Sequence, residues 1–274
     1  MQRQLRGPNG GPEESVDLGL DGARALVGGG SGGLGGAIGA ALSAEGARVA
    51  LVARPSERLE VATAALPGPG SGIAIGADLS TPDGPGDAVA RAAAALGGLD
   101  LLLVNSGGPP PGTFEDLDEA AWTRAIDGTL WSAIRLLRAA LPHLRSSDRP
   151  AILIILSSSA REPIPGLTTS NLLRPGLAGL IKSLTTEIAP VRINGIAPGR
   201  VATDRIAQID AATAQRTGAT PESIKAGVLA RIPLGRYGDP VEVGRLGAFL
   251  LSPAASYLTG AIIPIDGGMV RALP

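Results

Sequence analysis

Short apolar runs alternate with longer amphipathic stretches along most of the chain. The runs that predict strands are 25–27, 48–53, 72–77, 99–104, 151–156, 192–196 and 261–265. Between them apolar residues recur at helical spacing, and the predicted helices are 34–46, 87–96, 119–144 with a break near Pro142, 174–188, 221–230 and 240–251. Such alternation is typical of an α/β protein with a parallel sheet.

The run AILIIL at 151–156 is apolar at every position, as a strand covered on both faces must be. We therefore predict an α/β fold with a doubly wound parallel sheet of the Rossmann type. Ligands of such sheets bind outside the carboxyl ends of the strands, near the point where the strand order reverses. The loops that this rule gathers around one cleft follow Val27, Ala53, Val104, Leu156 and Ile196.

Two segments depart from the regular pattern. Residues 1–17 are polar and rich in Gly and Pro, which predicts a flexible arm in front of a single domain over 18–274. Residues 200–236 are polar and irregular apart from the helix predicted within them. Their position suggests a loop that covers the substrate.

Glycines crowd the segment between the first strand and the first helix, GGGSGGLG at 28–35. Because a glycine in regular structure costs about 0.5–1 kcal/mol relative to alanine, such crowding indicates positive φ angles or close approach of another backbone or a ligand. A pyrophosphate at a helix N-terminus is a ligand of that kind. The alternative is a general compositional bias, since the chain has 40 glycines.

Composition narrows the chemistry. A net charge of −1 gives no electrostatic footprint for nucleic acid or an acidic membrane, so we expect a small-molecule substrate. With no cysteine and one histidine, His143, we expect no metal site, and redox chemistry would need a cofactor. No apolar run approaches the ~20 residues of a membrane span, and the first residues do not resemble a signal peptide, so we expect a cytoplasmic protein.

Five segments in this order resemble the short-chain dehydrogenase/reductase family over about residues 20–269. GGGSGGLG resembles the TGxxxGxG turn, DL at 78–79 an adenine contact, NSGG at 105–108 the NNAG turn, and PGRVAT at 198–203 the PGxxxT segment. The ending, PLGRYGDPVEVGRLGAFLLSPAASYLTGAIIPIDGG, resembles the family's last helix and strand. The residues that the resemblance assigns to the cofactor are Gly29, Gly33, Leu34, Gly35, Asp78, Leu79, Asn105, Pro198, Gly199 and Thr203.

The resemblance also bears on which dinucleotide binds. Members that prefer NAD carry an acid at the end of the second strand, where this chain has Ala53 and Arg54. A guanidinium suits a 2′-phosphate, so the resemblance implies NADP, with NAD as the weaker candidate. The alternative is that Arg54 is simply a solvated loop residue.

The family's acid–base residues are replaced. Alignment places Ser157 at the family's serine, Ser170 at its tyrosine, Arg174 at its lysine and Thr129 at its asparagine. A rival alignment places Leu167 and Asn171 at the tyrosine–lysine pair, and neither contains a tyrosine. The loss matters because a phenol, with an ordinary pKa near 10, is a far better acid than an aliphatic hydroxyl.

Other polar side chains near the predicted cleft have a simpler interpretation. Glu162 is a candidate acid or base if it is buried, although it and Arg161 more often form a solvated loop pair. Tyr237 and Tyr257 fall in the C-terminal segments and are interpreted as structural. The same holds for the polar groups Asp127, Asp204 and His143.

Three functions remain open from the sequence. The first is an NADP-dependent oxidoreductase of a small carbonyl or alcohol substrate, in which Ser157, Ser170 and Arg174 replace the usual acid–base set. The second is an NADP-binding sensor or assembly subunit without redox turnover, and the third, less favoured, is a redox-neutral lyase or isomerase. The resemblance further implies a homo-oligomer, a tetramer or a dimer.

Overall fold

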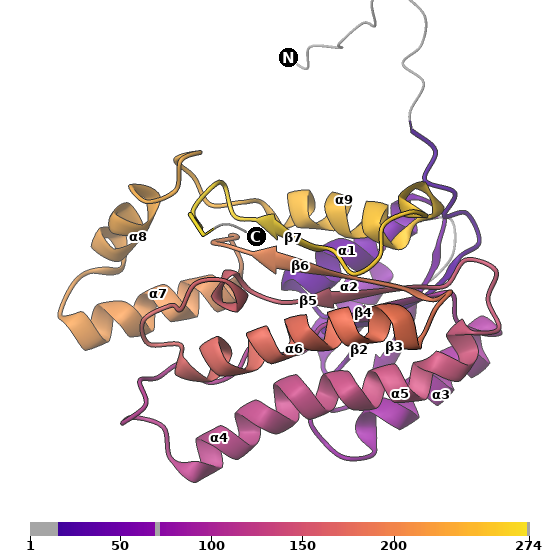
Figure 1. Cartoon of the computed structure of the whole chain (residues 1–274), viewed down its shortest axis with the longest axis horizontal. Helices are drawn as coiled ribbons and strands as arrows, with labels where there is room; N and C mark the ends of the chain where they lie inside the picture. The colour runs from indigo at the N-terminus through magenta and orange to yellow at the C-terminus, as the bar shows by residue number, and fades with distance from the viewer. Residues whose placement is uncertain (1–15, 69–71, 273–274) are drawn as a thin grey trace, which may run out of the picture.

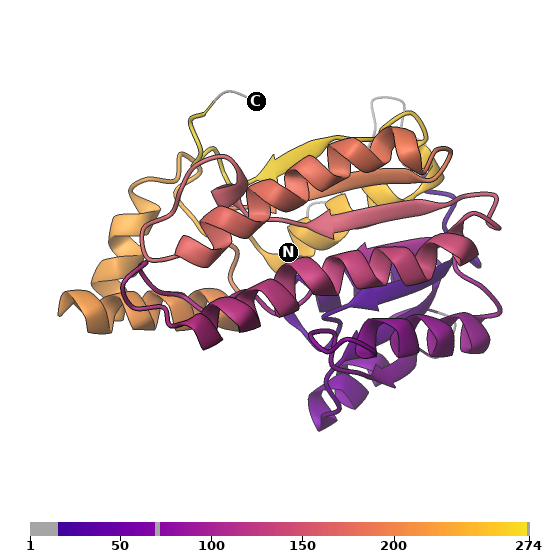
Figure 2. The same ribbon diagram turned by 60° about the horizontal axis from the view of Figure 1, so that its bottom comes forward.

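The computed structural model describes residues 16–68 and 72–272, which form one seven-stranded parallel sheet between two layers of helices (Figures 1 and 2). The strand order is β3-β2-β1-β4-β5-β6-β7. The strands are β1 (Arg24–Gly28), β2 (Arg48–Ala53), β3 (Ile73–Gly76), β4 (Leu101–Val104), β5 (Ala151–Ile155), β6 (Arg192–Pro198) and β7 (Ile262–Ile265). The predicted doubly wound α/β fold is confirmed, with its order reversal between β1 and β4.

The helices fall into two layers. The α-helices are α1 (Gly33–Ala44), α2 (Glu57–Ala64), α3 (Gly84–Leu96), α4 (Glu119–Ala125), α5 (Ser132–Leu144), α6 (Thr168–Glu187), α7 (Asp204–Thr217), α8 (Pro221–Leu229) and α9 (Pro240–Leu251). Helices α1 and α9 pack together on one face of the sheet, and α3, α5 and α6 cover the other. Helices α7 and α8 extend from one end of the molecule, beside the carboxyl ends of the strands (Figure 1).

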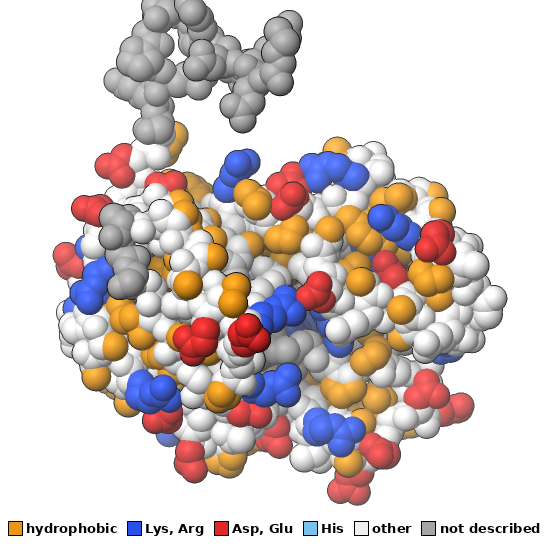
Figure 3. All heavy atoms as spheres, turned by 180° about the vertical axis from the view of Figure 1, so that it is seen from behind, with side chains coloured by type: hydrophobic (Ala, Val, Ile, Leu, Met, Phe, Trp, Pro, Cys, Tyr) orange, Lys and Arg blue, Asp and Glu red, His pale blue; other side chains and the backbone are white. Residues whose placement is uncertain are grey.

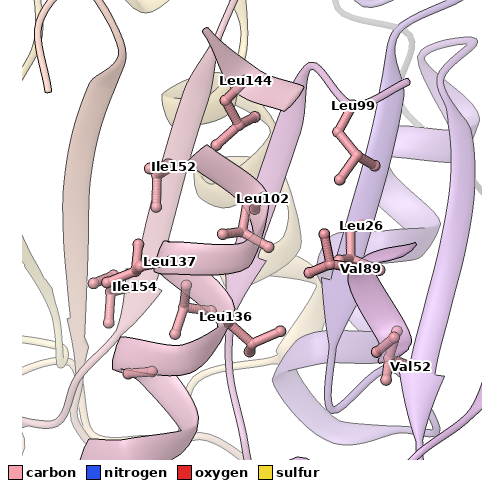
Figure 4. Close-up of a cluster of buried hydrophobic side chains, with 14 of the residues drawn as sticks. Leu26, Val52, Val89, Leu99, Leu102, Leu136, Leu137, Leu144, Ile152 and Ile154 are labelled. Carbon is pink, nitrogen blue, oxygen red and sulfur yellow. The ribbon is translucent and has the colours of Figure 1, made fainter. Parts of the chain in front are cut away.

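The side chains of alternate strand residues belong to two separate hydrophobic clusters. In β5, Ile152 and Ile154 point to the layer of α3, α5 and α6, whereas Leu153 and Ile155 point to the layer of α1 and α9. Figure 4 shows the first cluster, where side chains of α5 meet those of the strands. Each fully buried aliphatic side chain stabilises the fold by about 1.5–3 kcal/mol. The continuous apolar run at 151–156 is thereby explained.

Two of the predicted helices differ most from those observed. The stretch 119–144 is interrupted by a π-helical turn, η1 (Ile126–Trp131), and not near Pro142, which lies inside α5. Helix α6 begins at Thr168 and not at Arg174. The cause of the second error is Pro175: a proline usually marks a first helical turn, but here it lies within the helix and removes only one backbone hydrogen bond.

Two further segments contain more regular structure than expected. Helix α2 was missing from the sequence prediction; its N-terminus is capped by Ser56, whose hydroxyl accepts a hydrogen bond from Leu59 N at 3.4 Å. The segment 200–236 contains α7 in addition to the predicted helix near 221–230. Most of the predicted arm, residues 1–15, lies outside the described residues.

On the face of the molecule seen in Figure 3, acidic and basic side chains are interspersed, so this face does not indicate a strongly charged partner. Within 16–68 and 72–272, no helix combines the length and the apolar character that a membrane crossing requires.

Candidate cofactor cleft and active site

The glycine turn after β1 packs so closely against the loop after β4 that side chains are excluded. Gly29 has a φ of +62° and Gly33 a φ of +54°, in the left-handed region that favours glycine. A Cβ on Gly35 would collide with the carbonyl oxygen of Gly29 and lie 2.8 Å from the side-chain nitrogen of Asn105. Asn105 itself donates from Nδ2 to the Gly28 carbonyl oxygen at 3.2 Å.

Helix α1 begins at this turn with a free N-terminus. Its N-cap is Gly32, with no side-chain cap, and the first turn contains no acidic residue. The first backbone N–H groups of a helix lack partners within the helix, and the dipole at that end favours an anion. The turn and the helix therefore fit a pyrophosphate. Leu34, in the first turn of α1, is half-buried and packs against the core.

The end of the cleft at β2 and β3 carries charged side chains. Asp78 follows β3, and hydrogen bonds from the backbone N–H and hydroxyl of Ser80, helped by the charge of Arg54, hold the pKa of its carboxyl below the usual range. Arg54 therefore lies near Asp78. The Leu79 side chain is buried in the core, so only its backbone is available to a ligand.

Sequence reasoning missed Arg58, in the first turn of α2. Its Nε donates to the Ser31 carbonyl oxygen at 2.9 Å, and its Nη2 forms an ion pair with Asp204 Oδ2 at 2.8 Å. Both side chains are more than half exposed. The pair joins the glycine turn to α7 across the cleft rim. A helix prediction for 57–64, based on the Ser56 cap, would have brought Arg58 to attention.

The segment after β6 faces the glycine turn. β6 ends at Pro198, and Gly199 lies so close to Asp266 that a Cβ would come within 2.6 Å of the Asp266 Cβ. Thr203 caps α7, its hydroxyl accepting from Ile206 N at 3.4 Å. A Cβ on Gly33 would lie 3.8 Å from the Thr203 methyl group. The two segments that the sequence assigned to the cofactor thus meet across the cleft.

A cluster of serines lies after β5 and on α6. Ser157 caps the short turn η2 (Ser158–Ala160), and its hydroxyl oxygen accepts from Ser159 N at 3.1 Å. The buried hydroxyls of Ser159 and Ser170 are 2.9 Å apart and hydrogen-bonded. Sequence reasoning identified Ser157 and Ser170 but missed Ser159, although it stands in the same SSS triplet.

Arg174 lies one helical turn after Ser170 on α6, so both side chains project from the same face. It is 8% exposed, and its Nη1 donates to the Ile155 carbonyl oxygen at 2.5 Å. Burial, reinforced by the charge of Arg205, lowers the pKa of the guanidinium to about 10. Arg174 therefore still carries its positive charge at neutral pH.

The π-helical turn η1 contacts α6 and presents Thr129. The turn is tied to the loop after β4 because the Ser106 hydroxyl donates to the Gly128 carbonyl oxygen at 2.5 Å. In the described structure the hydroxyl oxygens of Thr129 and Ser132 are buried without a hydrogen-bond partner, and so is Nε of Arg174. Buried polar atoms without partners are costly and often mark a site that a ligand completes.

The rival alignment receives no support from the contacts of its residues. The Asn171 side chain accepts from Ile164 N at 2.9 Å and donates to the Ile164 carbonyl oxygen at 3.0 Å, so its amide holds the loop before α6. Leu167 is the N-cap of α6. Neither side chain is placed as an acid or base.

The two tyrosines are not candidates for the missing acid. Tyr237 donates to Asp210 Oδ2 at 2.8 Å, and burial together with that carboxylate raises the pKa of its phenol to about 12, which is the wrong direction for an acid at neutral pH. Tyr257 is fully exposed.

The remaining polar candidates are also placed by their contacts. Glu162 is exposed, whereas the Nη2 of Arg161 donates to the Ile262 carbonyl oxygen at 3.0 Å. Asp127 lies in η1, and His143 lies in the last turn of α5. The backbone N–H groups of Arg161 and Glu162 donate to the Ser158 carbonyl oxygen, but within the described residues none of the four side chains forms a hydrogen bond with the hydroxyl of Ser157, Ser159 or Ser170.

A hollow of about 190 Å³ opens beside the N-terminus of α6. It is bounded by the loop 164–167 and by α7, with Gly112, Ile209 and Arg216 among its lining residues. Its walls are partly polar and partly apolar, which suits a small molecule, and they include Leu167 at the start of α6.

Comparison with known proteins agrees with this architecture. The family model described as enoyl-(acyl carrier protein) reductase matches residues 29–270. Oxidoreductase UcpA of Salmonella typhimurium is 35% identical over 256 residues, 91% of this chain and 95% of that protein. Cis-4-hydroxycyclohexanecarboxylate dehydrogenase of Sinomonas cyclohexanicum is 30% identical over 247 residues, 89% of this chain and 95% of that protein.

Solved structures are similar over the same span. L-sorbose reductase of Gluconobacter frateurii, in complex with NADPH and L-sorbose, superposes with a TM-score of 0.87 at 29% identity, covering 94% of this chain and all of that one. An NADPH-bound short-chain oxidoreductase of Pseudomonas aeruginosa with an atypical catalytic center gives a TM-score of 0.81 at 33% identity, covering 92% and 98%. Fold, glycine turn and comparisons agree, and the chain belongs to the short-chain dehydrogenase/reductase family.

Proposed function

We propose that this protein is an NADP-dependent oxidoreductase that acts on a small carbonyl or alcohol substrate through an atypical acid–base site. The observation that carries the proposal is that the paired Ser159 and Ser170 hydroxyls, with the charged Arg174, lie at the same carboxyl end of the sheet as a glycine turn that fits a dinucleotide. Relatives described as dehydrogenases and reductases support the reaction class.

The cofactor would be held by backbone and side chains on the four loops that follow β1, β3, β4 and β6. The glycine turn with the N-terminus of α1 would take the pyrophosphate, Asn105 and Thr203 would flank the nicotinamide half, and Asp78 would contact the adenine. When bound, the nicotinamide supplies or takes up a hydride, which is the difficult part of the chemistry. The chain's own task is orientation and the handling of one proton.

Proton handling falls to hydroxyl groups in this proposal. Ser157 accepts a hydrogen bond from Ser159 N, so its own hydroxyl proton remains a potential donor to a substrate oxygen. Ser170, hydrogen-bonded to Ser159, would pass a proton between the substrate oxygen and water. Arg174 stabilises negative charge on that oxygen without giving up its own proton. Loss of the usual phenol costs a factor of about 10²–10⁴ in rate but does not abolish hydride transfer.

Preference for NADP is proposed on the charge at the end of β2. Arg54 and the missed Arg58 supply guanidinium groups there, and similar proteins were solved with NADPH. We expect Arg54→Asp to lower the ratio of NADP to NAD affinity about ten-fold or more, measured by titration calorimetry. Arg145→Asp, an exposed arginine at the end of α5, is the matched control. An unchanged ratio in Arg54→Asp would remove the assignment.

A second candidate, a dinucleotide-binding protein without turnover, is favoured by one observation: the absence of a tyrosine from the site. The two candidates separate when NADPH absorbance is followed with a panel of ketones, enones and quinones while NADPH affinity is measured in parallel. Oxidation with any substrate supports the oxidoreductase. Tight binding without oxidation across the panel supports the binding protein. A lyase role receives less support because Glu162 is exposed.

The oligomeric state is proposed from the resemblance and from an apolar groove between α5 and α6. Its walls include Leu137, Leu141, Leu180 and Leu184. Because an apolar groove on a surface often marks a subunit contact, we propose a dimer or homotetramer. Light scattering that gives the mass of a monomer would reject it. The cytoplasmic compartment stays a prediction from the sequence.

A further inference from the structure

The guanidinium of Arg174 has fewer hydrogen-bond partners than that of the half-buried Arg192. Arg192 donates to four carbonyl oxygens, those of Leu250, Leu251, Ser252 and Leu258. Within the described residues the Arg174 side chain makes a single hydrogen bond, to the Ile155 carbonyl oxygen, and its Nε is buried without a partner.

Other arginines form ion pairs with carboxylates, whereas Arg174 does not within the described residues. Arg24 pairs with Asp100 at 2.5 Å, and Arg200 with Asp210 at 2.9 Å. Within 16–68 and 72–272, no carboxylate oxygen lies within 4.0 Å of a guanidinium nitrogen of Arg174. A buried charge needs a partner of opposite charge or a full set of hydrogen bonds. Arg174 has neither in this part of the chain.

A second arginine, Arg205, lies nearby and is in the same situation. It stands in the first turn of α7, is half-buried, and donates from Nη2 to the Pro109 carbonyl oxygen at 2.5 Å. A Cβ on Gly108 would lie 3.0 Å from its Nε, so the guanidinium rests on the loop after β4. Among the described residues it has no carboxylate partner either, and its charge lowers the pKa of Arg174.

The loop after β4 connects Arg205 to the serine cluster. The Thr169 hydroxyl donates to the Pro110 carbonyl oxygen at 2.9 Å, next to the residue that Arg205 binds. Gly112 donates from its N to the Gly166 carbonyl oxygen at 2.8 Å. Thr169 directly precedes Ser170. Arg205 therefore lies near the N-terminal turn of α6, the helix that carries Ser170 and, one turn further on, Arg174.

We propose that Arg174 and Arg205 together bind a carboxylate of the substrate, so that the substrate is a small oxo acid or hydroxy acid. The inference rests on the proposed function and narrows its substrate class. Placing two positive charges close together with little exposure to water becomes favourable when one anion lies between them. A guanidinium can bind a carboxylate through two parallel hydrogen bonds. The anionic groups of the cofactor have their own candidate sites, at the N-terminus of α1 and at Arg54.

The test measures binding and needs no turnover. Pyruvate, acetoacetate and levulinate, each alongside its methyl ester, are titrated into the complex of the protein with NADP⁺, in which a carbonyl compound cannot be reduced. We expect at least one oxo acid to bind about ten-fold or more tightly than its ester. Equal affinities for all three pairs would overturn the proposal.

Variants at Arg205 locate the anion. Arg205→Leu should weaken the oxo acid about ten-fold or more, leave the ester and NADP⁺ within about two-fold, and be partly rescued by Arg205→Lys. Arg231→Leu, at an exposed arginine just after α8, is the matched control. If Arg205→Leu weakens NADP⁺ as much as the oxo acid, the anion is the cofactor's pyrophosphate and the proposal is wrong. Thermal melts show whether each variant is folded.

The oxidoreductase proposal and the carboxylate-site proposal can be rejected independently of each other. Tight binding of an oxo acid without NADPH oxidation would reject the oxidoreductase while keeping the carboxylate site. Oxidation of NADPH by neutral ketones as fast as by oxo acids, with equal binding, would reject the carboxylate site while keeping the oxidoreductase.

Discussion

The two ends of the sheet differ in how completely their buried polar groups are paired by hydrogen bonds and ion pairs. At the amino end, the Asp100 carboxylate accepts from Arg24 at 2.5 Å and from the Ser147 hydroxyl at 2.7 Å, while Arg192 is satisfied by carbonyl oxygens. At the carboxyl end, Thr129 and Arg174 keep buried polar atoms without partners in the described structure. Arg149, whose Nε is also unpaired, is the exception at the amino end, and its Nη1 still binds two carbonyl oxygens.

We interpret this difference as separating groups that stabilise the fold from groups proposed to bind a ligand. A completed network stabilises the native chain alone, whereas an incomplete one gains free energy only when something binds. Substitutions at the amino end should therefore change stability and leave binding intact. Substitutions at the carboxyl end should change binding or turnover and leave the fold intact.

The largest effect is expected at the glycine turn. In Gly35→Val the new Cβ meets the backbone oxygen of Gly29, which a small rotation cannot relieve. We expect NADPH affinity to fall about 10³-fold, because the turn must move away from the position that accepts the pyrophosphate. Calorimetric titration measures the loss, and Gly86→Val, in open space on α3, is the matched control. If Gly35→Val bound NADPH as tightly as the wild type, the glycine turn would not be the pyrophosphate site.

At the amino end, Asp100→Asn should reduce stability by about 3 kcal/mol, since it leaves the Arg24 charge without its partner. Denaturant melts measure the loss, and NADPH affinity should not change. The hydrogen bonds from Arg24 and Ser147 outweigh burial and lower the pKa of the Asp100 carboxyl. Its contribution is therefore complete above about pH 4 and is lost as the pH falls through the lowered pKa, so the two proteins should converge in acid. A constant difference down to pH 2 would reject this assignment.

A smaller effect tests the alignment of the reaction site. The double variant Ser170→Tyr with Arg174→Lys restores the family's acid–base pair, and reductase activity should rise about ten-fold or more if these positions are correct. The readout is the initial rate of NADPH oxidation. The control is Asn171→Tyr with Pro175→Lys, which introduces the same two side chains one residue further along α6. A folded double variant without any gain would count against the alignment.

Regular elements with strong local signals were the most predictable part of the fold. β2 and α9 were predicted with their observed bounds, since β2 is apolar at every position after Arg48 and α9 has Asp239 as its N-cap and Pro240 at its first position. The π-helical turn at 126–131 was missed because an inserted residue leaves the apolar pattern almost unchanged.

The site was predictable where it depends on the backbone and less so where it depends on long-range contacts. The glycine turn could be predicted since positive φ angles select glycine. The contacts of Arg58 with Asp204 and of Arg205 with Pro109 join residues far apart in sequence, and no spacing encodes them. The same is true of the bond between Ser159 and Ser170, which depends on how α6 docks against η2.

The most direct test of the account compares Ser170→Ala with the wild type on any carbonyl compound that the protein reduces. We predict a kcat that is lower by about 10²-fold or more, because the hydroxyl proposed to handle the proton is gone, with an NADPH affinity within about two-fold. That result would show a cofactor site and a reaction site that act separately. An unchanged kcat in Ser170→Ala would contradict the role of the serine cluster in turnover.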